Sequence, residues 1–198
     1  MRFIKNFSEM CLANAARNRY NTRMMKKTWF ERRMQRKRLL DARLQGLLFE
    51  LMAGSRLGES SQYVQHGTTS CLLHSLAVAY YSALAFRMLR ISFFERDLLR
   101  GALLHDYFLY DWHTPDDTRP LHAFAHPRIA LYNAQRDLTL TPLEKEIVLR
   151  HMFPVTLVPP RHREAWMVSL VDKLCSTYEA FHPSAYPGLR RLIPSACV

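Results

Sequence analysis

Apolar residues recur at helical spacing along most of this chain. Five of them fall on one face of residues 70–90: Leu72, Leu76, Ala79, Ala83 and Phe86. This spacing predicts an amphipathic helix. Further helical patterns cover about 93–106, 127–137, 142–151 and 161–181, and no segment alternates apolar and polar residues as a half-buried strand does. We therefore expect an all-α fold.

Two segments carry signals for the start of a helix. Residues 92–95, Ser-Phe-Phe-Glu, fit a capping box, in which the first and last side chains each bind the other residue's backbone N–H. Residues 141–144, Thr-Pro-Leu-Glu, combine a capping threonine with a proline at the first helical position. We expect the first helix to carry His105 and Asp106 in its last turns, and the second to run to about His151.

Charge divides the chain unevenly. Residues 1–45 hold 13 Lys and Arg against three Asp and Glu, a net of +10, whereas residues 46–198 hold 15 against 14, a net of +1. We predict a basic helical N-terminal extension over 1–45 and one domain over 46–198, with a Gly- and Ser-containing junction at 54–61. The extension is either a surface that binds RNA or an anionic membrane, or a solvated helix face.

Cysteine usage and hydropathy bear on the compartment. The four cysteines show no Cys-x-x-Cys spacing: Cys11, Cys71, Cys175 and Cys197. This pattern is typical of a reducing compartment. No run reaches the roughly 18 to 20 uncharged apolar residues that a membrane span needs. We therefore expect a cytoplasmic protein without a transmembrane segment.

The vicinal pair His105-Asp106 lies inside the apolar run 103–107. A buried imidazole and a buried carboxylate both need partners. Further histidines and an aspartate occur at wide intervals in segments with helical patterns: His74, His126, His151 and Asp172. Imidazole combined with carboxylate suits iron, manganese, zinc or nickel better than magnesium or calcium.

This order of residues, His, His-Asp, His, His, Asp, resembles that of the HD-domain metal-dependent phosphohydrolases. The flanking residues are most similar to the type that hydrolyses symmetrical dinucleoside tetraphosphates. The similar segments are Leu72–Ala79, Gly101–Tyr107, His126–Leu131, Leu149–His151 and Ser169–Lys173. The resemblance covers about residues 66–180. One position departs from it, because Leu109 stands where many two-metal members carry a lysine that helps to hold phosphate.

The resemblance implies a helical domain that binds two metal ions, with iron or manganese favoured and zinc or nickel as alternatives. The first ion would be held by His74, His105, Asp106 and Asp172. The second would be held by Asp106, His126 and His151. A water bridging the two ions would become the hydroxide that attacks phosphorus. Asp106 is thus central to catalysis, and Lys173 and Arg128 are candidates to offset charge on the leaving oxygens.

The implied activity is hydrolysis of a nucleotide, with a dinucleoside polyphosphate as first candidate, or of another small phosphorylated metabolite. Two other classes stay open. Some HD proteins with two iron ions are oxygenases, and a non-enzymatic protein that binds nucleotide or RNA would also use phosphate contacts. His122 is an alternative to His126 as a ligand, since it lies one helical turn earlier. A monomer and a homodimer are both compatible with the sequence.

Overall fold

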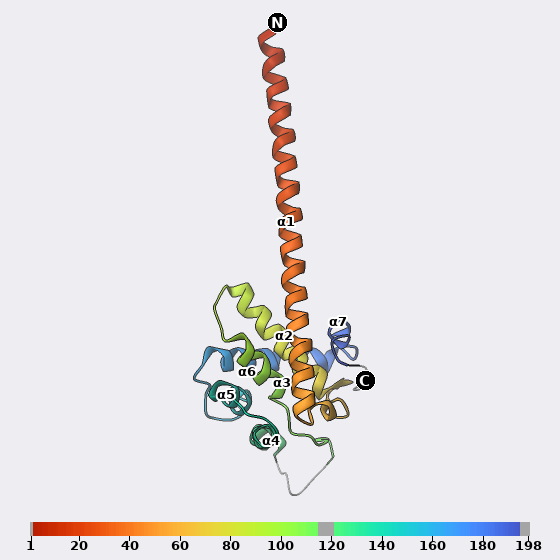
Figure 1. Cartoon of the computed structure of the whole chain (residues 1–198), viewed down its shortest axis with the longest axis vertical. Helices are drawn as coiled ribbons and strands as arrows, with labels where there is room; N and C mark the ends of the chain where they lie inside the picture. Colours follow the sequence, from red (N-terminus) through yellow and green to blue (C-terminus); the bar gives the residue numbers. More distant parts are fainter. Residues whose placement is uncertain (1, 115–120, 195–198) are drawn as a thin grey trace. The chain divides into compact units, whose positions relative to one another are not determined.

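The computed structural model describes the backbone of residues 2–114 and 121–194, and side chains from residue 28 onward within these ranges (Figure 1). In these ranges the helices are α1 (Arg2–Gly54), a 3-10 helix η1 (Leu57–Ser61), α2 (Cys71–Leu89), α3 (Glu95–Leu104), α4 (His122–Asp137), α5 (Pro142–Arg150), α6 (Arg163–Phe181) and α7 (Pro187–Arg190). A short antiparallel hairpin joins β1 (Val64–His66) to β2 (Thr69–Ser70). The predicted helical class is confirmed.

The chain divides into two compact units, Met1–Ala42 and Arg43–Val198. The first unit consists of α1 up to Ala42, and the side chains of residues 28–39 are exposed. The second unit holds the end of α1 and all later elements. The expected junction at 54–61 coincides with the end of α1 and with η1.

The core of the second unit forms where α2 packs against α3 and α6, and where α3 packs against α5. The contact between α3 and α5 is close because of Gly101. A Cβ atom at this position would lie 2.9 Å from Cδ1 of Ile147, so any larger residue would push the two helices apart. This approach places the end of α3, with His105, beside the end of α5, with His151.

Helix α2 is long and apolar enough to cross a membrane, judged by length and composition alone. In this structure 67% of its most apolar window is buried by neighbouring elements. The core helix of a globular protein has the same composition, because it is apolar on all sides.

One of the two predicted helix starts is wrong. Helix α3 begins at Glu95, and no side chain caps it. The carboxylate of Glu95 instead pairs with the guanidinium groups of Arg43 and Arg87, so it is not available to the backbone. The predicted start at Thr141 is confirmed, and Thr141 and Glu144 form a capping box there with N···O distances of 3.2 and 3.0 Å.

The other differences concern element boundaries. Helix α4 begins at His122, five residues before the predicted start, and α3 ends at Leu104, just before the His-Asp pair.

The hairpin was not predicted. It turns at Gly67, whose φ of +57° is strained for other residues. Part of the predicted loop 111–123 lies outside the described residues. Cys197 also lies outside them. Cys71 and Cys175 are buried free thiols.

Candidate metal centre

Five elements bring the six predicted ligands into one buried cluster. His74 comes from α2 and Asp172 from α6, while His105 and Asp106 follow the last residue of α3. Helix α4 contributes His126, and His151 follows α5 directly. All six residues are at most 5% exposed. The structure therefore places together residues that are up to 98 positions apart in the sequence.

Asp106 lies at the middle of this cluster. Its Oδ2 is 3.4 Å from Nε2 of His105 and 3.7 Å from Nε2 of His74. Its Oδ1 is 3.3 Å from Nε2 of His126 and 3.6 Å from Nε2 of His151. One carboxylate thus faces imidazoles on both sides, one pair for each oxygen.

The potential ligand atoms form two overlapping groups. In the first, those of His74, His105 and Asp172 all lie within 4.8 Å of one another, and Asp172 Oδ1 is 3.0 Å from His74 Nε2. In the second, the same limit holds for His105, Asp106 and His151. Each group has the size of a metal coordination sphere.

The histidines are oriented by their second ring nitrogen. In three of them Nδ1 lies 2.7–3.1 Å from a backbone carbonyl oxygen, pairing His105 with Ala102, His126 with His122 and His151 with Val148. Because a carbonyl oxygen only accepts hydrogen bonds, Nδ1 carries the proton. A neutral ring then directs the lone pair of Nε2 into the cluster, which is how metal-bound histidines are commonly held.

Two further observations show that the cluster fits a cation. Nε2 of His126 and Nε2 of His151 are only 2.8 Å apart, although Nδ1 already carries the proton of each neutral ring. Two lone pairs at this distance repel, and a cation held by both nitrogens would remove that repulsion. Among the described residues, the buried atoms His105 Nε2 and Asp106 Oδ1 have no hydrogen-bond partner. Such atoms are costly unless a ligand binds them.

Two buried residues that support the cluster were not predicted. Glu179 accepts a hydrogen bond from Nδ1 of His74, with O···N distances of 2.9 and 3.0 Å. Gln65 donates from Nε2 to Oδ2 of Asp106 at 2.7 Å, and its carbonyl oxygen accepts from the thiol of Cys71. A signal for Glu179 exists in the sequence: it follows Asp172 by seven residues, which returns to the same face of a helix. Gln65 lies in the unpredicted hairpin.

The pKa values of the buried groups are shifted in different directions across the cluster. Burial lowers the pKa of His74, but its hydrogen bonds to Asp172 and Glu179 outweigh burial and hold the pKa well above its usual value. Burial and the neighbouring imidazoles of His105 and His126 lower the pKa of His151 to about 3. Burial raises the pKa of Asp172, but the neighbouring imidazoles of His105 and His74 bring it well below the usual value.

Of the two predicted cationic residues, only Lys173 lies beside the cluster. Its ammonium group donates to the backbone oxygens of His151, at 2.8 Å, and Ser169, at 3.1 Å, and lies 3.7 Å from Oδ2 of Asp172. Arg128 is exposed on α4, two residues after His126. Two residues turn a helix by about 200°, so Arg128 points away from the side that carries His126.

His122 lies next to the cluster and belongs to neither of the two groups of potential ligand atoms described above. Its ring stacks on that of His126, with centroids 4.6 Å apart, and its Nδ1 is 2.8 Å from the hydroxyl of Tyr110. Burial and the neighbouring imidazole of His126 lower the pKa of His122 to about 4. The structure thus places His122 where it packs against His126, one of the predicted ligands.

No protein-family model, curated protein or solved structure matches this chain. A helical fold supports many unrelated activities. The function is therefore argued from the chemistry of the buried cluster.

Proposed function

We propose that this protein is a metal-dependent phosphohydrolase of the HD type that acts on a nucleotide or another small phosphorylated metabolite. A dinucleoside polyphosphate is the first candidate substrate. The observation that carries the proposal is the shared carboxylate of Asp106, which faces two imidazole Nε2 atoms with each oxygen. A single carboxylate between two groups of imidazoles supports a site for two ions.

In this proposal the first ion is held by His74, His105, Asp106 and Asp172, and the second by Asp106, His126 and His151. Nitrogen and carboxylate ligands favour iron or manganese, with zinc or nickel as alternatives. Two such ions, when bound, lower the pKa of a water molecule and neutralise charge on a phosphoryl oxygen.

The surrounding residues prepare the site for that chemistry. Glu179 and three backbone carbonyl oxygens fix the rings so that every Nε2 points inward. Gln65 holds one oxygen of Asp106 in place. Lys173 supplies a positive charge near Asp172, where it can offset charge on the leaving oxygens of the substrate. The buried thiols of Cys71 and Cys175 agree with a cytoplasmic location.

The proposal is tested by metal analysis combined with a phosphate-release screen. Protein purified without oxygen should carry close to two transition-metal ions per chain. With manganese or iron it should release phosphate or a mononucleotide from at least one member of a panel of nucleotides, dinucleoside polyphosphates and sugar phosphates, without needing oxygen. Oxygen consumption without phosphate release would favour the oxygenase alternative, and nucleotide binding without turnover would favour a regulatory protein.

A further inference from the structure

Helix α6 carries apolar side chains on its exposed face as well as on its buried face. Its inward face carries small and apolar residues, such as Val168 and Val171, and among them three buried acidic residues, Glu164, Asp172 and Glu179. Its outward face carries large apolar and aromatic side chains that are 44–77% exposed: Trp166, Leu170, Leu174, Tyr178 and Phe181. A surface helix normally buries its apolar stripe and exposes its charges. Here the inward face serves the metal centre, and that function leaves the outward apolar stripe unexplained.

The outward face of α6 carries little charge, with Arg163 and Lys173 beside Trp166 and Leu170 at one end of the stripe. After Arg163, the exposed positions of this fully described helix are apolar or small and uncharged: Trp166, Leu170, Leu174, Thr177, Tyr178, Ala180 and Phe181. The nearest cation, Lys173, is half-buried and bound to backbone oxygens. Binding to nucleic acid depends on lysine and arginine, so this surface does not suit it. Exposed apolar patches of this kind mark contacts with an apolar partner.

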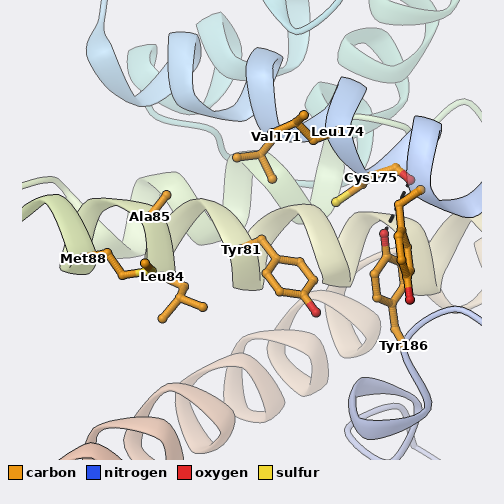
Figure 2. Close-up of a pocket in the computed structure, with 9 residues that line it drawn as sticks. Tyr81, Leu84, Ala85, Met88, Val171, Leu174, Cys175 and Tyr186 are labelled. Carbon is orange, nitrogen blue, oxygen red and sulfur yellow. Dashed lines mark hydrogen bonds between the residues drawn. The ribbon is translucent and has the colours of Figure 1, made fainter.

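The apolar surface continues onto α2. A groove of about 370 Å³ lies between the two helices and is lined mainly by apolar atoms. Figure 2 shows Tyr81 and Met88 from α2 on one side of it and Leu174 from α6 on the other. Met88 and Leu89 are among the most exposed apolar side chains of the second unit. The stripe of α6 and this end of α2 therefore form one surface, which we call the α2–α6 face.

We propose that the α2–α6 face binds the same face of a second copy of this chain, with the two α6 helices antiparallel. The spacing of the stripe favours this partner. Trp166, Leu170, Leu174 and Tyr178 are four residues apart, so they are symmetric about position 172. A two-fold axis there places Leu170 opposite Leu174 of the partner subunit, and Trp166 opposite Tyr178 of the partner subunit. Such self-complementarity is what a two-fold interface requires.

The size of the surface supports a stable dimer. Eight side chains on it are exposed and large: Tyr81, Met88, Leu89, Trp166, Leu170, Leu174, Tyr178 and Phe181. At their observed exposure each offers on the order of 100 Å². The sum is roughly 800 Å² per chain, which is the share that each partner contributes to a standard specific interface.

The test is the mass of the full chain in solution, measured by light scattering at micromolar concentration. The wild-type protein should have twice the chain mass of 23.3 kDa. Leu174→Glu, and separately Leu170→Glu, should shift it to the single-chain mass, because each would bury charges close to the axis. Tyr132→Glu is the matched control, since Tyr132 is 68% exposed on α4, and it should leave the dimer intact. Helical circular dichroism and metal content should be unchanged in all three variants.

A cross-linking experiment tests the antiparallel register. Leu170→Cys and Leu174→Cys would be made separately in a chain that also carries Cys11→Ser and Cys197→Ser. After mixing and mild oxidation, disulfide-linked dimers should form several-fold faster from the mixture than from either variant alone. A monomeric wild-type protein, a dimer that survives Leu174→Glu, or a monomer that binds phosphatidylcholine vesicles through this face would each overturn the proposal.

Discussion

The two halves of the buried cluster differ in charge although they share Asp106. In one half, His74 lies between Asp172 and Glu179, at 3.0 and 2.9 Å. In the other half, His126 and His151 face each other at 2.8 Å, and Asp106 is their carboxylate neighbour. We call these the carboxylate-rich and the imidazole-rich half. The first attracts protons as well as cations, as the raised pKa of His74 shows.

This difference means that the proposed ions are not equivalent. Two extra carboxylates lower the energy of a cation in the carboxylate-rich half, because Coulomb attraction is only weakly screened in a buried site. The imidazole-rich half offers two neutral nitrogens and depends on Asp106 for charge. We therefore expect the carboxylate-rich half to bind its ion more tightly, and the other ion to be the first that is lost.

The largest effect is expected from Asp106→Ala, which removes the group that the two halves share. Both ions should be lost, and phosphate release should fall by at least about a thousandfold, since metal activation of water is then absent. Metal content by mass spectrometry and the initial rate measure the two effects. Asp111→Ala is the control, because Asp111 is exposed and binds His113 and Thr114 instead. A variant at Asp106 that keeps two ions would refute the shared-ligand assignment.

A second pair of variants separates the two halves. His151→Ala should lower the metal content from two ions per chain to about one, because it removes a ligand from the imidazole-rich half alone. His74→Ala should weaken the tighter site and leave less than one ion per chain. Removing a ligand also leaves neighbouring polar atoms unpartnered, so both variants should lose most activity. Equal metal contents in the two variants would contradict the difference between the halves.

The six residues of the cluster could be predicted from the sequence, because their order resembles that of the HD-domain phosphohydrolases; apolar spacing alone placed them only in or beside helices. The supporting residues could not. Gln65 lies in β1, which has three residues, too few for an alternating pattern to be visible. Glu95 was expected to cap α3, yet its carboxylate is held by two arginines, one of them 52 residues earlier in the chain. Such long-range pairings override local signals.

The orientation of α6 shows a second reason why sequence patterns are incomplete. Its apolar stripe from Trp166 to Phe181 has helical spacing, and an apolar stripe normally indicates the side that packs on the core. In the structure this stripe is exposed, and the inward side carries smaller apolar residues such as Val168 together with Asp172 and Glu179, which His74 binds. Periodicity identifies two faces of a helix, and tertiary contacts decide which one is buried.

A smaller effect is expected at Glu179, which positions His74 and does not face the ions. Glu179→Ala should weaken metal binding by about 10- to 100-fold, as loss of a partner to a ligand histidine usually does. Glu179→Gln keeps an acceptor for Nδ1 and should restore part of the affinity. Competition with a chelator measures both. Glu164→Gln is the control, because Glu164 is also buried on α6 but accepts from the backbone of Phe94, and its metal affinity should equal that of the wild type.

The stability of the metal-free protein should depend on pH in the direction set by His74. Its pKa is raised in the folded state, so its protonation stabilises the fold fully below the unfolded pKa of about 6.5, and this contribution is lost as pH rises through the folded pKa. An imidazole must lose its proton before it binds a metal ion, so the melting temperature of the metal-loaded protein should rise with pH. Melting temperatures at pH 6 and pH 9, with a chelator or with manganese, test this. A chelated protein that melts higher at pH 9 would contradict it.

The smallest effects are expected from the two predicted cationic residues, Arg128 on α4 and Lys173 beside Asp172. Arg128 is exposed on α4 and points away from the imidazole-rich half, so Arg128→Ala should change phosphate release by less than about threefold, in the range of weak surface electrostatics. Lys173 is half-buried and 3.7 Å from Asp172 in the carboxylate-rich half. Lys173→Met should therefore lower turnover by about tenfold or more while metal content is retained, because the lost charge would stabilise the transition state and not the ions. A larger effect at Arg128 than at Lys173 would show that phosphate is bound from the side of α4, and would reverse the assignment of the two cations.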